Sequence, residues 1–201
     1  MAPTTPVRVS TLGYAILGLL AREPLSGYDL AALLKMPVGY YWTAQHGQIH
    51  PELQRLLADG LVTYQATRGP GPHPKKVYTI TPSGSRILRS WVTEPPRPRP
   101  VRDELVLKAA SLWFADTAAA LRLFRAEAER HAEQLATYEA TRTSMEARYG
   151  ASLQRPGRPE FAEYVTLRCG ISYETHRLGW CRWVIELLEQ ADAWPEPPGR
   201  R

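Results

Sequence analysis

The 201-residue sequence is poor in cysteine, with Cys169 and Cys181 as its only two. Two cysteines do not make the disulfide framework that stabilises small secreted domains. No charged leader is followed by an apolar segment and a small-residue cleavage site, so we expect no export. The longest apolar run, Ala15 to Ala21, is far too short to cross a bilayer. These absences predict a cytoplasmic protein without a membrane partner.

Motifs that carry catalysis or hold cofactors are lacking as well. The chain has no glycine-rich phosphate loop, no Gly-x-Ser-x-Gly turn around a nucleophile and no convincing acid and base pair. Cys169 and His176 fall on one helical face, and His46 and His50 form an i,i+4 pair, but neither pair has the further ligands that a metal site needs. The sequence therefore predicts no enzyme, no metal and no cofactor.

The composition is that of a folded, basic protein. Hydrophobic residues make up 44% of the chain and charged residues 22%, which are proportions of a globular chain. Lysine and arginine number 25 against 20 acidic residues, for a formal net charge of +5. A basic balance favours a polyanionic partner, provided that the positive charge gathers on one surface.

A proline-rich segment divides the chain in two. Residues 93–101 contain four prolines, which favour an extended, semi-rigid spacer. We therefore predict one domain over 1–92, a linker over 93–101, a second, helical domain over 102–192 and a tail over 193–201.

The first domain alternates helix and turn signals. Ser10 and Ser26 can each cap a helix, with a short break over 23–25 between the two helices. A third helix is followed by two β-like runs, 61–65 and 76–80, which flank a loop rich in glycine and proline. A fourth helix, capped by Thr81 with Pro82 in its first turn, closes the domain. Three helices, a hairpin and a closing helix are the layout of a winged helix-turn-helix.

Several short motifs occur along this domain in a specific order. They are 11–20 (Thr-Leu-Gly-Tyr-Ala-Ile-Leu-Gly-Leu-Leu), 27–30 (Gly-Tyr-Asp-Leu), 42–43 (Trp-Thr), 47–53 (Gly-Gln-Ile-His-Pro-Glu-Leu), 75–78 (Lys-Lys-Val-Tyr) and 80–84 (Ile-Thr-Pro-Ser-Gly). In this order they resemble the PadR-like transcriptional regulators, although that family usually has tyrosine where His50 stands. Residues 102–108 resemble the start of the longer helical C-terminal domain of one branch of the family.

The resemblance and the element pattern together predict the fold class. We expect a mostly α protein with a small β-hairpin, in which an N-terminal winged helix-turn-helix precedes a C-terminal all-helical dimerisation domain. The resemblance implies a DNA-binding transcriptional regulator, most simply a ligand-responsive repressor that acts as a homodimer. The alternative is a protein-interaction module that uses a winged-helix scaffold without specific DNA binding.

The third helix has an apolar and a polar face at about 100° per residue. The apolar face, expected to pack on the first two helices, consists of Ile49, Leu53, Leu56 and Leu57. The polar face carries Gln48 and Arg55, with Ala44, Gln45 and Glu52 nearby. Glutamine can pair bidentately with adenine and arginine with guanine, whereas a solvated helix face is the alternative. Pro51 predicts that the helix starts near Gly47 or kinks there.

The hairpin loop is basic and contains no acidic residue. Such a loop suits contact with phosphates or the minor groove of double-stranded operator DNA, although an ordinary basic hairpin has the same composition. From the third helix and this loop together, the predicted DNA-binding residues are Thr43, Gln45, Gln48, His50, Arg55, Arg68, His73, Lys75 and Lys76.

The second domain has helical patterns over about 102–114, 116–149 and 159–190. The last of these is apolar on more than one side, which exceeds what a monomer needs and predicts a homodimer that binds a palindromic site. The middle segment has a strict 3-4 stripe typical of a helix packed lengthwise on others. That stripe consists of Leu121, Phe124, Ala128, His131, Leu135, Tyr138, Arg142, Met145 and Tyr149.

Aromatic residues of the second domain could line an effector pocket, although aromatic core packing is the default interpretation. The resemblance implies a small, often aromatic effector. His131, a polar member of the apolar stripe, could set helix register, sense pH or touch that effector, with a hydrogen-bonded core histidine as the alternative. The candidate effector residues are Trp113, Phe114, His131, Trp180 and Trp183.

Overall fold

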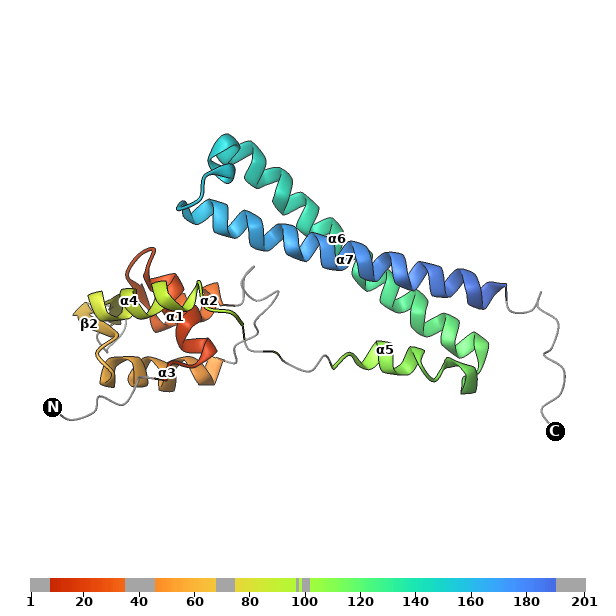
Figure 1. Ribbon diagram of the computed structural model, residues 1–201, viewed down its shortest axis with the longest axis horizontal. Helices are drawn as coiled ribbons and strands as arrows, with labels where there is room; N and C mark the ends of the chain where they lie inside the picture. The colour runs from red at the N-terminus through yellow and green to blue at the C-terminus, as the bar shows by residue number, and fades with distance from the viewer. Residues whose placement is uncertain (1–7, 35–45, 68–74, 97, 99–101, 191–201) are drawn as a thin grey trace. The chain divides into compact units, whose positions relative to one another are not determined.

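The computed structural model describes residues 8–34, 46–67, 75–96, 98 and 102–190. The chain divides into two compact units, Met1–Arg97 and Pro98–Arg201, and Figure 1 shows the helices and strands of each. The described residues are mostly helical, with a small antiparallel sheet in the first unit. The fold class predicted from the sequence is therefore confirmed.

Capped helices build the first unit, as the sequence predicts. The hydroxyl groups of Ser10, Ser26 and Thr81 accept hydrogen bonds from backbone N–H groups three residues further on, which supplies partners that the first turn of a helix otherwise lacks. The elements of this unit are α1 (Thr11–Leu20), β1 (Leu25–Ser26), α2 (Gly27–Leu33), α3 (His46–Ala58), β2 (Val62–Thr67), β3 (Lys75–Ile80) and α4 (Pro82–Trp91).

Strands β2 and β3 form the predicted hairpin, which we call the wing, and β1 extends it to a three-stranded sheet in the order β1-β3-β2. All pairs are antiparallel, with Leu25 and Tyr64 both opposite Tyr78. The sequence predicts only a break over 23–25, because a two-residue strand is too short to produce an alternating pattern. Strand β1 joins the wing directly to the start of α2.

The core of the first unit lies among α1, α2 and α3. The predicted apolar face of α3 is confirmed, since Ile49, Leu53 and Leu56 are buried and Leu57 packs against the same core. Gly60 has a φ of +67°, a conformation that ends α3 at low cost only in glycine. The chain then turns directly into the wing.

The second unit consists of α5 (Glu104–Ala109), a 3₁₀ turn (Leu112–Phe114), α6 (Thr117–Tyr149), a second 3₁₀ turn (Gly150–Gln154) and α7 (Pro159–Glu189). The sequence pattern predicts one helix over 102–114. Ser111 instead leaves the helical conformation (φ −114°, ψ 11°), and its N–H donates to the carbonyl of Lys108. This three-residue bond tightens the chain and separates α5 from the 3₁₀ turn.

Helices α6 and α7 run antiparallel and side by side (Figure 1). The predicted stripe on α6 is its buried face, with Phe124, Ala128, His131 and Tyr138 buried and the remaining members half-buried. From α7, Leu178, Cys181 and Val184 pack into the same core. Burial raises the pKa of the Cys181 thiol, so this side chain serves packing rather than nucleophilic chemistry.

Membrane-spanning helices and clusters of metal ligands are both absent from the described ranges. Within them, no helix combines the length and the apolar character needed to cross a membrane. Nor do three or more histidine, cysteine, aspartate or glutamate side chains gather there as metal ligands.

Candidate nucleic-acid interface

Helix α3 has an exposed polar face, and its opposite, apolar face is buried in the core. Its described residues run over His46–Ala58 and include Pro51. The side chains of Gln48, His50 and Arg55 are exposed. Because the opposite face is fixed in the core, these three side chains are displayed from a rigid support.

Arg55 is held by an acidic residue of its own helix. Its Nη1 lies 3.2 Å from Oε2 of Glu52, and Oε1 of Glu52 accepts a 2.6 Å hydrogen bond from the Ser10 hydroxyl. The helical period predicts Glu52 near the exposed face, which is wrong, because only 6% of this residue is exposed. A glycine inside α1, at position 13, leaves the space for its carboxylate, and a glycine in an apolar helix is the one sequence signal of this approach.

The wing carries two exposed lysines, Lys75 and Lys76, at the start of β3. Nζ of Lys75 lies 3.2 Å from Oδ2 of Asp29, and Nζ of Lys76 lies 4.6 Å from the ring centre of Tyr64. Asp29 also accepts from the hydroxyl and the N–H of Ser26. These two bonds, followed by Lys75, lower the pKa of the Asp29 carboxyl, so the wing is joined to α2 by a charged contact.

Of the predicted DNA-binding residues, five lie in the described part of the first unit. Gln48, His50 and Arg55 come from α3, and Lys75 and Lys76 come from β3. The other four, Thr43, Gln45, Arg68 and His73, lie outside the described residues.

Sequence reasoning missed Tyr28, a largely exposed aromatic residue in the first turn of α2. Together with Gly27, Ile49, His50 and Leu53, it lines a pocket of about 250 Å³ between α2 and α3. A tyrosine hydroxyl is among the groups that contact DNA phosphates. Its place in the Gly-Tyr-Asp-Leu motif was visible, but nothing in the pattern indicated that the ring would be exposed.

Comparison with known proteins finds a family match in each of the two units. The transcriptional regulator PadR-like family matches residues 16–90, and the virulence activator alpha C-terminal family matches residues 101–189. The negative transcriptional regulator PadR of Bacillus subtilis is 32% identical over 184 residues, which are 89% of this chain and 98% of that protein. This chain belongs to the PadR-like family of transcriptional regulators.

Solved structures of the Bacillus subtilis regulator are similar over the same length. The crystal structure of that PadR in complex with operator DNA has a TM-score of 0.69 at 32% identity and covers 89% of this chain and 99% of its own. The complex of the same protein with p-coumaric acid has a TM-score of 0.65 at 32% identity and covers 90% and 99%. The similarity therefore spans both units of this PadR-like chain.

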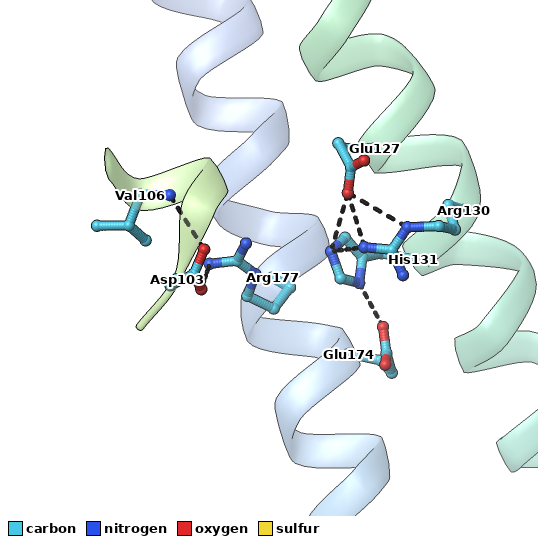
Figure 2. A network of polar contacts seen from close by, with 7 residues as sticks. All are labelled: Asp103, Val106, Glu127, Arg130, His131, Glu174 and Arg177. Carbon is cyan, nitrogen blue, oxygen red and sulfur yellow. Dashed lines mark hydrogen bonds and ion pairs between the residues drawn. The ribbon is translucent and has the colours of Figure 1, made fainter. Parts of the chain in front are cut away.

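In the second unit, His131 lies at the centre of a buried polar network between α6 and α7 (Figure 2). Only 1% of the residue is exposed. Its Nδ1 contacts Oε2 of Glu174, and its Nε2 lies 3.0 Å from Nη2 of Arg130, which in turn is 2.7 Å from Oε2 of Glu127. Because arginine can only donate, Nε2 accepts and the ring proton sits on Nδ1, directed at Glu174. His131 thus has the position of a hydrogen-bonded core histidine.

The aromatic effector candidates separate into two groups. Trp180 is half-buried, with its ring 5.5 Å from that of Phe124. By contrast, Trp183 is 55% exposed, and Trp113 and Phe114 are largely exposed and contact each other edge to face. Within this single chain, the candidates therefore divide between the α6–α7 interior and the surface.

Two buried charged residues of α7 were not singled out from the sequence. Glu174 binds His131, and Nη1 of Arg177 lies 3.0 Å from Oδ2 of Asp103 (Figure 2). The guanidinium of Arg177 also lies 4.8 Å from the ring centre of Trp180. Asp103 caps α5 through the N–H of Val106, so this ion pair ties the start of α5 to α7.

Proposed function

We propose that this PadR-like regulator is a repressor that binds double-stranded operator DNA as a homodimer and responds to a small aromatic effector. The observation that carries the proposal is the display of Gln48, His50 and Arg55 on α3 in the same unit as the lysines of the wing. Support for repression comes from the Bacillus subtilis relative, a negative regulator whose structure contains operator DNA.

The two parts of this surface have different chemistry. Glutamine and arginine on a helix can form bidentate hydrogen bonds with base edges in the major groove. Lys75 and Lys76 suit phosphate contacts, which add affinity with little sequence information. An ammonium group has three donors, so Lys75 can bind a phosphate oxygen while it keeps its contact with Asp29.

A second copy of the chain would cover the apolar surface of the helical unit. Large apolar side chains exposed there are Val106, Leu107, Trp113, Phe114, Val165, Tyr173, Trp183 and Leu187. Exposed apolar residues in such number on one small unit are typical of an interface. A two-fold dimer would present two winged units to the two halves of a palindromic operator.

The effector we propose is a small aromatic compound, by analogy with the p-coumaric acid complex of the relative. Trp113, Phe114, His131, Trp180 and Trp183 remain its candidate contacts. We expect the compound to lower operator affinity. This role requires neither catalysis nor a cofactor, and it places the protein in the cytoplasm, where bacterial operators lie.

Binding to the promoter regions of its own and adjacent genes tests the proposal. By fluorescence anisotropy, the wild-type chain should bind one of these regions with an affinity that weakens as salt rises. Lys75→Ala with Lys76→Ala should weaken binding to all DNA and reduce the salt slope by about 2, or about one per lysine. Gln48→Ala should cost about 1–3 kcal/mol for the operator alone.

Arg86→Ala serves as a control, since Arg86 is an exposed arginine of α4 that bonds to Ser83 of its own helix. It should change the affinity far less than the wing variant. If the wild-type chain binds no promoter DNA, or binds without salt dependence, the protein-interaction alternative is favoured instead.

A further inference from the structure

Glu52 is a buried carboxylate in the middle of the exposed DNA-binding helix. Its two oxygens have separate partners, the Ser10 hydroxyl at 2.6 Å and the Arg55 guanidinium at 3.2 Å. Ser10 belongs to the N-cap of α1, whereas Glu52 and Arg55 belong to α3. One carboxylate therefore fixes the start of α1 and an arginine of α3 at the same time.

The packing around this carboxylate is shaped to receive it. A Cβ atom at Gly13 would lie 2.6 Å from Oε1 of Glu52, so a larger residue at this position would displace the carboxylate from its place. The N-terminal end of α1 also favours a negative charge. Burying a charge is nevertheless costly, and an apolar side chain often serves stability as well or better. The arrangement therefore indicates a role of Glu52 other than stability, and its contact with the exposed Arg55 suggests that role.

That partner is an arginine whose side chain is 72% exposed. An unrestrained arginine loses much rotamer freedom when it binds, and it loses less when its planar group is already oriented. Glu52 engages Nη1, which leaves the edge formed by Nε and Nη2 for a second partner. That edge carries two parallel N–H donors, the arrangement that matches a guanine edge or a phosphate.

We propose that Glu52 is a positioning residue that holds Arg55 for a bidentate contact with a pair of acceptor atoms on the operator, either a guanine edge or a phosphate. The inference rests on the proposed function, because it needs DNA at α3. It adds a residue that does not itself touch the DNA and that sequence patterning placed on the wrong face.

The decisive variant is Glu52→Gln, which keeps an acceptor for Ser10 but loses the charge that holds Arg55. We expect operator affinity to fall roughly 5- to 30-fold, because Arg55 must then be ordered on binding. If the acceptor is a guanine edge, affinity for random-sequence DNA should stay equal or rise, because a negative charge near the phosphates is removed. If it is a phosphate, affinity should fall for all DNA. In either case the loss should require Arg55, whereas a purely structural role of Glu52 would lower affinity in the Arg55→Ala background as well.

A double-mutant cycle with Arg55→Ala isolates the pair. In the Arg55→Ala background, Glu52→Gln should have little further effect on operator binding. Arg55→Lys keeps a positive charge next to Glu52 but lacks the planar fork, so it should weaken operator binding about as much as Glu52→Gln. Since Arg55 is exposed, this variant tests the proposal even if Glu52→Gln does not fold.

The control is Glu127→Gln, which breaks a similar i,i+3 ion pair with Arg130 in the other unit and should leave DNA affinity unchanged. The Arg55→Ala variant separates the two acceptors: a loss confined to the operator indicates guanine, and a loss for all DNA indicates phosphate.

Unchanged operator affinity in Glu52→Gln and Arg55→Lys, or additive effects in the cycle, would overturn the inference alone. A wild-type chain without preference for any promoter DNA would overturn the proposed function, and this inference with it.

Discussion

At the scale of single residues, Asp29 performs two tasks with one carboxylate. It accepts from Ser26 to complete the capping box of α2, and it pairs with Lys75 of the wing. Both contacts require the ionised form, and the Ser26 bonds are the main reason why its pKa is lowered. Both the cap of α2 and the contact between α2 and the wing therefore depend on the ionisation of one carboxyl group, and so on pH.

Asp29→Asn should lower the free energy of unfolding by about 1 kcal/mol at pH 7, because a charge at a helix start and an exposed ion pair each contribute about half of that. The carboxyl pKa is lower in the folded than in the unfolded chain, so this stability is present above about pH 4 and is lost as the pH falls through the lowered value. Urea unfolding followed by circular dichroism at pH 7 and pH 3 measures it. An equal gap between variant and wild type at both pH values would contradict this account.

Residue-level prediction from sequence succeeded where the cause is local. The caps at Ser10, Ser26 and Thr81 depend on residues within three positions, and all were recognised. The burial of Glu52 and the pairing of Lys75 with Asp29 depend on segments about 40 residues apart in the chain. No helical or alternating period encodes such contacts, so they became visible only in three dimensions.

At the scale of elements, the α6–α7 pair combines an apolar seam with one polar layer. His131 and Glu174 are both buried and face each other across the two helices (Figure 2). A polar layer inside an apolar seam is best known as a device that fixes register between helices. The neighbouring pair of Glu127 and Arg130 is more exposed and should matter less.

His131→Leu should therefore lower the free energy of unfolding of the helical unit by about 3 kcal/mol, because it leaves the Glu174 carboxylate buried without its donor. Thermal and urea unfolding of the full chain would measure the loss. Glu127→Gln, on the same helix, is the matched control and should cost less than about 1 kcal/mol. A His131→Leu variant as stable as the control would show that the imidazole does not stabilise the buried Glu174 carboxylate.

Long helices, in which a regular hydrophobic period is repeated many times, were the most predictable elements. The stripe of α6 and the bounds of α7 follow from many residues that agree with one another. The break at Ser111 and the two-residue strand β1 involve too few residues to leave a pattern. Strand β1 exists because its backbone pairs with β3, which is a property of the assembled sheet rather than of its own sequence.

At the scale of the whole molecule, the two units fold around separate cores. The sequence placed the division in the proline-rich segment, and in the structure the first compact unit ends at Arg97, within that segment. Separate cores allow variants of one unit to be made without loss of the other. The proposed dimer can therefore be tested in the helical unit while the winged unit keeps its proposed DNA-binding surface.

A test of the dimer needs one variant at an exposed position and one in the core, and Trp183 and Leu135 are suitable positions. Leu135 packs into the α6–α7 core, whereas Trp183 is an exposed residue of α7. Leu135→Asp should unfold the helical unit, since it buries a charge in an apolar seam. Trp183→Asp should keep the helical content of the wild type and dissociate the dimer, as measured by circular dichroism and sedimentation.

Dissociation of the dimer should remove the preference for an intact operator over a single half-site, whereas a surface substitution outside the dimer interface should leave that preference unchanged. A dimer that engages both halves of an operator gains from the second contact through effective concentration, by a factor of about 10²–10⁴. The wild type should thus prefer an intact operator to a single half-site by a large factor, and Trp183→Asp should bind both nearly alike while keeping the half-site affinity of the wild type. A Trp183→Asp variant that remains a dimer with full operator preference would remove this face of α7 from the interface and leave the α5 and 3₁₀-turn residues as its candidates.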